Sequence, residues 1–326
     1  MPQSTVLILG ANGRLGSALV SAFTVRGWRV LAQSRRPGVV PASMPVIADL
    51  RDVDRVIRVI RVTKATLHIG SVDVVINAVN PVYTRWAEEA VARNDASIAI
   101  AKALGATLIL PGNVYNFGTD LPEQLGSDTP QHPREAQTSK GKIRVAMEHA
   151  LAVSAEQGTQ AFVIRAGDFF GCGAGSWFDQ AIAKDARRGK LTYPGPLNLI
   201  HAWAYVPDLA ATFVHVAEAR HTLGRFENIH FAGHAVTGYE FVQTMQQVAQ
   251  RKFKVSGMPW SLIRWVGVVK PLWRDLAEMS YLWQRPHRLV TDAAHAHLIA
   301  PTTPLDAAIA ASLRELSAQQ PHQPPR

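Results

Sequence analysis

Three glycines stand at a spacing that suits the binding of a dinucleotide phosphate. In the run VLILGANGRLGSALV they follow an apolar stretch and precede a segment of helical spacing. Glycine lets the backbone turn tightly toward a pyrophosphate, and the first N–H groups of a helix favour its negative charge. The alternative is a tight packing turn without a ligand. The residues predicted to bind the cofactor here are Gly10, Asn12, Gly13, Arg14, Leu15 and Gly16.

The residues after the next apolar run bear on which dinucleotide binds. An NAD site usually has an acidic residue there, which holds the ribose 2′-hydroxyl. No Asp or Glu precedes Asp49, and the run continues instead into QSRRP. Because Ser34, Arg35 and Arg36 can receive a 2′-phosphate through hydrogen bonds and ion pairs, we expect NADP rather than NAD. Solvated surface arginines are the alternative.

Short apolar, β-branched runs alternate with segments of helical spacing along the first half of the chain. The strand-like runs cover 5–10, 28–33, 72–77, 106–110 and 160–165. Helical spacing marks 15–23, 85–104 and 143–155. Uninterrupted apolar runs are typical of strands buried on both faces of a parallel sheet. The alternation therefore predicts an α/β, Rossmann-like, doubly wound parallel sheet.

The composition changes after about Phe170, where Gly, Pro and Trp become frequent. A chain of 326 residues, 47% of them hydrophobic, suits a large domain and a smaller one. We expect a small C-terminal substrate lobe that is interleaved with the last strands of the sheet. The expected parts are an NADP-binding domain at 1–170, the lobe at 171–316 and a flexible polar tail at 317–326.

The glycine spacing G-x-x-G-x-x-G and the segment VYNFG together resemble the extended short-chain dehydrogenase/reductase family, which includes NAD-dependent epimerases and dehydratases of sugar nucleotides. The resemblance runs from Ser4 to about Leu316. It implies that Asp49 and Leu50, in IADLRD, contact adenine, although Asp49 is also suited to a helix N-cap. It further implies cofactor contacts for the backbone of Asn77, Ala78 and Val79.

This sequence departs from the family at the catalytic residues. The family uses a serine or threonine near the end of the fifth strand and a Tyr-x-x-x-Lys pair on the next helix. In PGNVYNF, the serine position is taken by Pro111, and Asn113 is the nearest polar replacement. Tyr115 is our best candidate for an acid or hydrogen-bond donor, and a packed tyrosine is the alternative.

The helix expected next, in QTSKGKIRVAMEHAL, has no Tyr-x-x-x-Lys in any frame. Alignment on Glu148 puts Lys140 at the tyrosine position and Arg144 at the lysine position, and another frame pairs Thr138 with Lys142. Arg144 is still able to bind ribose or phosphate, whereas Lys140 becomes an acid only if its pKa is lowered. The alternative is that both are solvated helix residues.

The second half of the chain offers fewer candidates. Arg165, in VIRAGDFFG, is expected to support the site, and Asp208 is expected to cap a helix of the lobe. Thr237 and Glu240 match a capping box. Four tryptophans are more readily explained by core packing than by a substrate cleft. They are Trp260, Trp265, Trp273 and Trp283.

Composition narrows the classes of partner. The single cysteine, Cys172, excludes a disulfide framework and favours a reducing compartment, so we expect a cytoplasmic protein. The twelve histidines show no tight metal spacing, and His295 and His297 are two apart, which does not bring them together on a helix, so we expect no metal. The charge of +9 without a nucleic-acid motif indicates an anionic small molecule rather than nucleic acid. No apolar run reaches about 18 residues, so we expect no membrane partner.

These features predict an NADP-dependent oxidoreductase or epimerase that transfers hydride to or from a carbonyl or hydroxyl carbon, with a substrate resembling a sugar nucleotide. The alternative is a non-catalytic NADP-binding regulator or redox sensor. The missing catalytic pattern favours the regulator, and the complete substrate half favours the enzyme. The family resemblance also implies a homodimer formed through the helices near Trp86–Leu104 and Lys140–Leu151.

Overall fold

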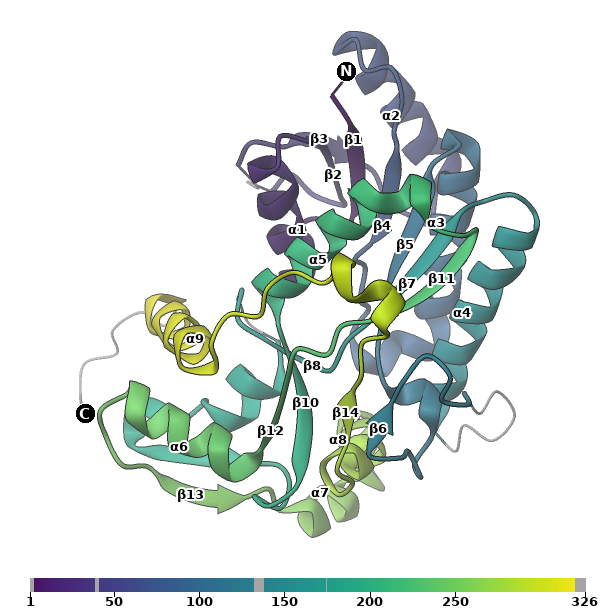
Figure 1. Ribbon diagram of the computed structural model, residues 1–326. Helices are drawn as coiled ribbons and strands as arrows, with labels where there is room; N and C mark the ends of the chain where they lie inside the picture. Colours follow the sequence, from purple (N-terminus) through teal and green to yellow (C-terminus); the bar gives the residue numbers. More distant parts are fainter. Residues whose placement is uncertain (1–2, 39–40, 132–137, 174, 320–326) are drawn as a thin grey trace.

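The computed structural model describes residues 3–38, 41–131, 138–173 and 175–319. Within these residues, seven strands form the main sheet: β1 Thr5–Leu9, β2 Arg29–Ser34, β3 Met44–Ile47, β4 Val74–Asn77, β5 Thr107–Gly112, β7 Ala161–Arg165 and β11 Phe226–His230. All pairings are parallel, in the order β11-β7-β5-β4-β1-β2-β3 (Figure 1). The strand order reverses at β1, and ligands of open α/β sheets bind at the carboxyl ends beside such a point.

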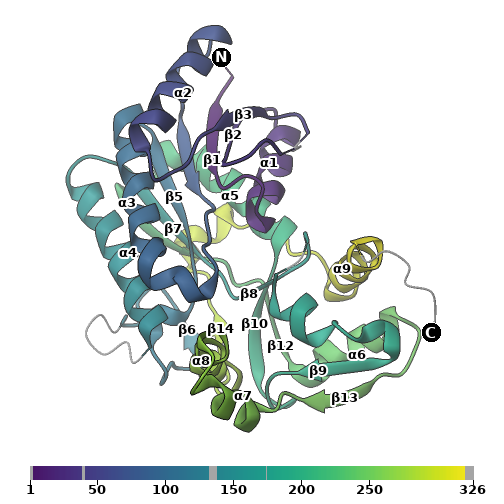
Figure 2. The ribbon, with the colours of Figure 1, turned by 180° about the vertical axis from the view of Figure 1, so that it is seen from behind.

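Helices cover both faces of this sheet (Figures 1 and 2). The helices on one face are α1 Arg14–Val25 and α5 Val206–Ala219, and those on the other are α2 Val53–Thr66, α3 Trp86–Leu104 and α4 Ser139–Glu156. Alternate residues of β1 enter different cores, since Val6 and Ile8 pack with α1 and α5 while Leu7 and Leu9 pack on the opposite side. The strands are thus buried on both faces, and the predicted Rossmann-like fold is confirmed.

The sequence pattern does not predict the strand β3, which forms one edge of the sheet. β3 is short and contains Pro45, which argues against an internal strand. At the edge, β3 pairs only with β2, so a proline is tolerated there. The helix that follows, α2, buries only Val56 and Ile60 completely, which leaves a weak apolar stripe.

Smaller sheets and helices form the C-terminal lobe. Its strands and those beside it are β6 Gln124–Leu125, β8 Asp168–Phe170, β9 Lys190–Tyr193, β10 Ile200–Tyr205, β12 His234–Thr237, β13 Lys254–Gly257 and β14 Arg288–Leu289. Its helices are α6 Gly238–Val248, α7 Trp260–Gly267, α8 Pro271–Glu278 and α9 Leu305–Gln319. Although β8 lies inside residues 1–170, it pairs with β10 of the lobe, whereas β11 returns to the main sheet. The chain therefore passes between the two parts more than once.

Local signals in the lobe have mixed outcomes. The predicted capping box is confirmed, because Thr237 and Glu240 exchange hydrogen bonds at the start of α6. The predicted cap at Asp208 is wrong. This residue lies inside α5, and its carboxylate accepts the Thr303 N–H and hydroxyl, each at 2.7 Å. Residues 317–319 continue α9 beyond the expected start of the tail, and 320–326 lie outside the described residues.

The four tryptophans do not share one environment. Trp283 is 2% exposed and belongs to the core, as expected. Trp260 is half-buried, and its indole donates to the Pro194 carbonyl at 2.6 Å. Trp265 is 75% exposed and Trp273 37%, so the core-packing prediction is wrong for both. The reason is that α7 and α8 pack against the protein on one side only, which local spacing does not reveal.

Candidate functional site

The glycine turn is built by close backbone contacts at the end of β1. Gly10 has a φ of +77°, and its N–H donates to the side-chain oxygen of Gln33 at 3.0 Å. A Cβ on Gly16 would lie 2.2 Å from the Gly10 carbonyl oxygen, and one on Gly13 would lie 3.2 Å from it. Packing therefore explains the glycines of this turn by itself, and Leu15 is buried beneath them.

The start of α1 is also suited to a phosphate. Its N-cap is Gly13, no side chain caps it, and its first turn has no acidic residue. The first N–H groups of a helix have no intrahelical acceptor and lie at the positive end of its dipole. The turn thus presents a concave backbone surface and N–H donors, which fit a pyrophosphate. Packing and ligand binding are compatible interpretations of the same glycines.

Arg14 joins the glycine turn to the C-terminal lobe. Its guanidinium lies 2.6 Å from the carboxylate of Asp179, and both side chains are largely buried. The same carboxylate accepts the backbone N–H groups of Gly175 and Ser176 and the Ser176 hydroxyl. Burial alone would raise the pKa of Asp179, but hydrogen bonds from Ser176 and Arg14 outweigh it and hold the pKa below its usual value. No feature of the sequence predicts this pair, because its members are 165 residues apart.

Ser34, Arg35 and Arg36 follow β2 next to the glycine turn. The Ser34 hydroxyl is buried and donates to the Arg36 carbonyl at 2.6 Å, while both arginines are exposed. Among the described residues, neither arginine is in an ion pair. Asn12 lies over Gly38, where a Cβ would meet its amide at 2.1 Å. Exposed arginines suit a 2′-phosphate and a solvated surface equally, so the NADP assignment stays a prediction.

Asp49 is engaged by arginines. Its carboxylate accepts Arg51 Nη2 at 2.8 Å and Arg93 Nη1 at 3.1 Å. Hydrogen bonding from the Arg51 side chain holds the pKa of Asp49 well below its usual range. The N-cap of α2 is Asp52, so the cap interpretation of Asp49 is wrong. Leu50, the neighbour of Asp49, is buried.

Residues 77–79 run beside the glycine turn. Asn77 is buried, its amide donates to the Ser97 hydroxyl at 3.2 Å, and its side-chain oxygen accepts the Val79 N–H at 3.3 Å. The Ala78 N–H donates to the last carbonyl of β1. A Cβ on Gly10 would lie 3.0 Å from the Val79 side chain. The structure therefore brings three separate predicted segments, 10–16, 34–36 and 77–79, to the carboxyl ends of β1, β2 and β4.

The strand β5 tolerates Pro111 because of the side to which the backbone nitrogen at this position points. The N–H of Thr107 points toward β4 and that of Leu108 toward β7, and this alternation turns Pro111 toward β4. Pro111 lies beyond Ile109, the last β5 residue that pairs with β4, so the proline interrupts no pair of that ladder. Its carbonyl accepts Nη1 of Arg144 at 2.9 Å instead.

Asn113 and Tyr115 form the turn after β5. The side-chain oxygen of Asn113 accepts the Tyr115 N–H at 3.0 Å, so this amide shapes the backbone. Tyr115 is 6% exposed, and its ring centroid lies 6.2 Å from that of Trp86. Arg165 is fully buried, donates to the Asn113 carbonyl and pairs with Glu148 of α4 at 2.6 Å. Arg165 thus supports this turn from below.

Lys140 and Arg144 share one face of α4 but have different partners. Lys140 is 2% exposed, and its Nζ lies 3.1 Å from Oε2 of Glu278 and 3.8 Å from Oδ1 of Asp275, both on α8. Arg144 is half-buried, with its guanidinium 5.0 Å above the Trp86 ring. The interpretation of Lys140 as a solvated residue is therefore wrong. Lys140 is directed toward α8 and Arg144 toward the end of β5.

A buried group that the sequence reasoning missed lies where β8 and β10 meet. His201 Nε2 is 2.8 Å from Asp168 Oδ2, and its ring stacks on Trp283 at 4.0 Å. The ring of His287 meets His201 edge-on at 4.6 Å. Burial, then the nearby His201, lowers the pKa of His287 to about 3. These residues lie on separate segments of the chain, so their spacing in the sequence carries no signal that they meet.

Asp168 comes three residues after the end of β7, at the carboxyl edge of the sheet, and is partly exposed. An Asp–His pair of this kind can accept or donate a proton if a substrate reaches it. In the described part of the chain, no cluster of three His, Cys, Asp or Glu side chains could hold a metal ion.

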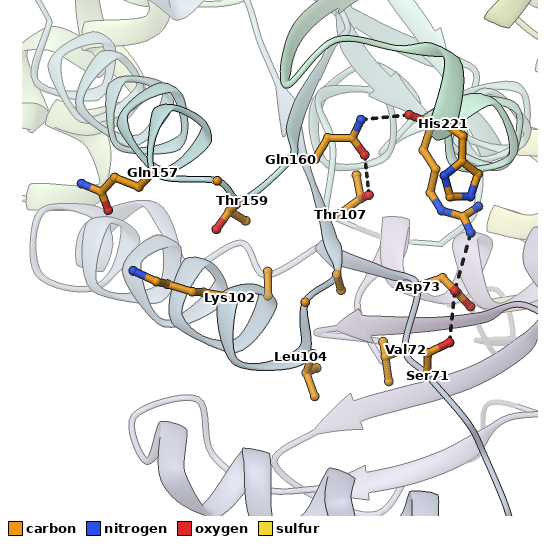
Figure 3. Close-up of a pocket in the computed structure, with 15 residues that line it drawn as sticks. Ser71, Val72, Asp73, Lys102, Leu104, Thr107, Gln157, Thr159, Gln160 and His221 are labelled. Atoms are coloured by element: carbon orange, nitrogen blue, oxygen red, sulfur yellow. Dashed lines mark hydrogen bonds and ion pairs between the residues drawn. The ribbon is translucent and has the colours of Figure 1, made fainter.

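A separate depression of about 480 Å³ lies at the amino ends of β4, β5 and β7 (Figure 3). Thr107 donates to Gln160 at 2.7 Å on its wall, and Arg220 lies 3.6 Å from Asp73. Figure 3 shows Lys102 and Gln157 at the ends of the helices around it. Because the glycine turn lies at the carboxyl ends of the strands, this depression is on the opposite edge of the sheet from the candidate site.

The chain resembles known proteins in sequence and in fold. Residues 6–230 match the family described as the NAD dependent epimerase/dehydratase family. No curated protein matches the chain significantly. None of the described helices has the length and apolarity needed to span a membrane.

Solved structures resemble the chain over nearly its whole length. The dTDP-glucose 4,6-dehydratase from Bacillus anthracis str. Ames, in complex with NAD, has a TM-score of 0.73 at 11% identity, over 97% of each chain. The L-threonine dehydrogenase from Clostridium difficile has a TM-score of 0.73 at 18% identity, over 97% of this chain and 98% of that one. The UDP-glucose 4-epimerase from Brucella ovis, in complex with NAD, has a TM-score of 0.72 at 17% identity, over 96% and 98%. At these identities the likeness concerns the fold.

Proposed function

The chain belongs to the NAD dependent epimerase/dehydratase family, and we propose from this that it is an NADP-dependent oxidoreductase or epimerase. Its substrate is a small anionic molecule resembling a sugar nucleotide, as the names of the dehydratase and epimerase above suggest. The observation that carries the proposal is the meeting of the glycine turn with residues 34–36 and 77–79 at the switch point of the sheet. A bound nicotinamide supplies a hydride donor or acceptor there.

The preference for NADP rests on the end of β2. Ser34 takes the place of an acidic residue, and its bond to the Arg36 carbonyl bends the chain directly after the strand. Two exposed guanidinium groups follow, each able to donate several hydrogen bonds to a phosphate. A 2′-phosphate beside them gains charge-assisted hydrogen bonds, which an NAD ribose lacks.

Substitution of both arginines tests the cofactor assignment. We expect Arg35→Ala with Arg36→Ala to weaken NADPH binding on the order of a hundredfold, from the loss of charged hydrogen bonds, and to leave NADH binding unchanged. Titration calorimetry with each nucleotide measures this.

The matched control is Arg55→Ala with Arg58→Ala, which removes two exposed arginines of α2. Equal affinity of the wild-type protein for NADPH and NADH, or an equal effect of the two double variants, would show the NADP assignment to be wrong.

Proton transfer requires a group near the reacting carbon. We propose Tyr115 for this role, with Asn113 holding the turn that presents it. Lys140 is a weaker candidate than its position suggests, because its ammonium is already paired with Glu278. The Asp168–His201 pair is a second candidate, since Asp168 lies just past the carboxyl end of β7 and its carboxylate contacts the His201 ring at 2.8 Å. Arg144, held between Pro111 and the Trp86 ring, is proposed to bind the cofactor ribose.

Two substitutions separate these candidates. With NADPH oxidation followed against aldehydes, ketones and sugar nucleotides, Tyr115→Phe should lower kcat by about a hundredfold or more without changing the Kd for NADPH. If His201→Gln has this effect instead, the Asp–His pair is the proton-transfer group. Turnover unaffected by both would remove both assignments.

A non-catalytic NADP-binding regulator is the second candidate function. The observation that favours it is the buried pairing of Lys140 with Glu278, because alignment on Glu148 puts Lys140 at the position of the family's tyrosine. Tight NADPH binding without turnover of any compound in the panel would support the regulator and contradict the enzyme.

A further inference from the structure

The outer face of α7, α8 and their connection exposes an unusual amount of apolar surface. We call this segment the hairpin, residues 260–278. Its exposed large apolar side chains are Leu262, Trp265, Val268, Val269, Leu272 and Trp273. The exposed fraction reaches 83% at Val268 and 75% at Trp265. Elsewhere in the described chain, exposed apolar residues such as Val25 and Val62 belong to other elements and stand apart, and scattered residues of that kind are normal.

The basic and acidic side chains of the hairpin lie on opposite sides of it. Arg264, Lys270 and Arg274 are exposed, and among the described residues none of them is in an ion pair. The two acidic residues, Asp275 and Glu278, are directed inward, where they pair with Lys140 of α4. The outward surface is therefore apolar and cationic, with no acidic side chain between its cations.

The hairpin is fixed to the protein along its inner side. Ile263 is buried, and the Trp260 indole donates to the Pro194 carbonyl at 2.6 Å. A Cβ on Gly267 would meet the backbone of Arg274 at 3.0 Å, so the two helices cross closely. In both views, α7 and α8 lie at the end of the molecule far from the N-terminus (Figures 1 and 2). These contacts hold the hairpin in place while its outer face stays exposed.

We propose that the hairpin docks on the surface of a bilayer that contains anionic lipids, lying in the interface without crossing it. Trp, Leu and Val side chains enter the boundary between headgroups and acyl chains, and Trp favours this depth. The three cations then lie at the level of the lipid phosphates, where each basic residue strengthens attachment. The shortness of the apolar runs excludes a span but not this arrangement, so the expectation of no membrane partner is replaced by this proposal.

Charge distinguishes between two possible partners of the hairpin, a lipid surface and a second copy of the chain. A symmetric contact through the hairpin would place three cations against three identical cations in a protein of net charge +9. An anionic bilayer neutralises the same charges. The hairpin also lies near the candidate site, because α8 contacts the turn Tyr83–Arg85 between β4 and α3, and Glu278 of α8 pairs with Lys140 of α4.

Vesicle co-sedimentation of the full chain tests the proposal. We expect binding to vesicles of phosphatidylcholine with phosphatidylglycerol at 3:1, weaker binding to phosphatidylcholine alone, and release by added salt. Trp265→Ser with Val269→Ser should weaken binding at least about tenfold. Arg264→Gln, Lys270→Gln and Arg274→Gln together should weaken binding to the anionic vesicles on the order of a hundredfold.

The matched control is Val25→Ser with Val62→Ser, which removes two valines exposed by 85% and 65% on other helices. It should bind vesicles like the wild type, and circular dichroism should show all variants folded. The proposal is overturned if the wild type binds neither vesicle, or if the hairpin and control variants bind alike. It is also overturned if the hairpin variants leave vesicle binding unchanged but turn a dimer into a monomer on sedimentation, because a second copy then covers the face.

Discussion

At the scale of single residues, the glycine turn is determined by sterics before any ligand is considered. Gly16 lets α1 begin within contact distance of the turn, because a Cβ there would lie 2.2 Å from the Gly10 carbonyl oxygen and 2.8 Å from the Ala11 Cα. Both obstacles are backbone atoms, which cannot rotate away as the end of a side chain can. The same closeness brings the first N–H groups of α1 to the crevice, so packing and phosphate binding require the same residue.

Gly16→Ala should therefore destabilise the protein and weaken the cofactor site together. We expect a loss of about 1–3 kcal/mol in the free energy of unfolding from overpacking, measured by urea denaturation, and weaker NADPH binding. The control is Gly70→Ala, because nothing lies within 4 Å of a Cβ at Gly70. That variant should stay within about 0.5 kcal/mol of the wild type. Equal behaviour of the two variants would contradict this account of the turn.

At the scale of elements, α8 acts as a cap for α4. Glu278, the last residue of α8, accepts both the N–H and the hydroxyl of Ser139 and pairs with Lys140. A carboxylate at a helix N-terminus is favoured by the dipole, and Glu278 also places a negative charge 3.1 Å from the buried ammonium of Lys140. Burial alone would raise the pKa of Glu278, but the hydrogen bonds from Ser139 and Lys140 lower it overall. Hydrogen bonds and an ion pair thus connect the hairpin to α4, the helix beside the candidate site.

Glu278→Ala should lower the free energy of unfolding by about 2–4 kcal/mol, since it removes a carboxylate that lies 3.1 Å from the buried ammonium of Lys140. Urea denaturation measures this, and Glu156→Ala, an exposed residue near the other end of α4, is the matched control. Adding Lys140→Met to Glu278→Ala should recover part of the loss, because no buried cation remains. A Glu278 variant as stable as the Glu156 variant would show that the pair contributes nothing.

At the scale of the whole molecule, two buried histidines lie where segments distant in the sequence meet. His230 ends β11, and its ring nitrogen Nδ1 lies 3.1 Å from the Leu125 carbonyl oxygen. Burial, then the charge of Arg165, lowers the pKa of His230 to about 4. His287, with a pKa of about 3, lies against β10, where its backbone N–H donates to the Ile200 carbonyl. Both side chains are neutral in the folded protein at neutral pH.

Stability should therefore fall as the medium becomes acidic. The folded-state pKa values lie below the usual value of 6.5, so the unfolded chain binds more protons as the pH falls through 6.5. At pH 5 the loss is about 2 kcal/mol for each residue, before carboxylates contribute. Urea denaturation at pH 7.5 and pH 5 measures it.

The variant that tests this assignment is His287→Gln, which should show a smaller loss between the two pH values than the wild type. His221→Gln, at an exposed position, should lose as much stability as the wild type. An unchanged loss in the His287 variant would refute the role of this histidine.

The fold and the phosphate turn were open to prediction because near neighbours in the sequence determine them. Apolar runs such as residues 5–9 and 161–165 require burial on both faces, and a doubly wound sheet is the arrangement that provides it. Gly10, Gly13 and Gly16 meet steric demands within one turn of chain, and the capping box at Thr237 closes over three residues. The edge strand β3 has no such signal, because a strand at the edge of a sheet can be short and can contain a proline.

Contacts between distant segments were decided only by the tertiary structure. Arg14 meets Asp179, Lys140 meets Glu278, and Asp168 meets His201, and in each case the partner lies on another element. Spacing along the chain carries no record of such pairs, because it reports only which residues share a helix face or a strand face. The position of α7 and α8 on the surface was likewise decided only by the tertiary structure. Their tryptophans have the composition of a core, and only packing on one side leaves Trp265 and Trp273 exposed to solvent.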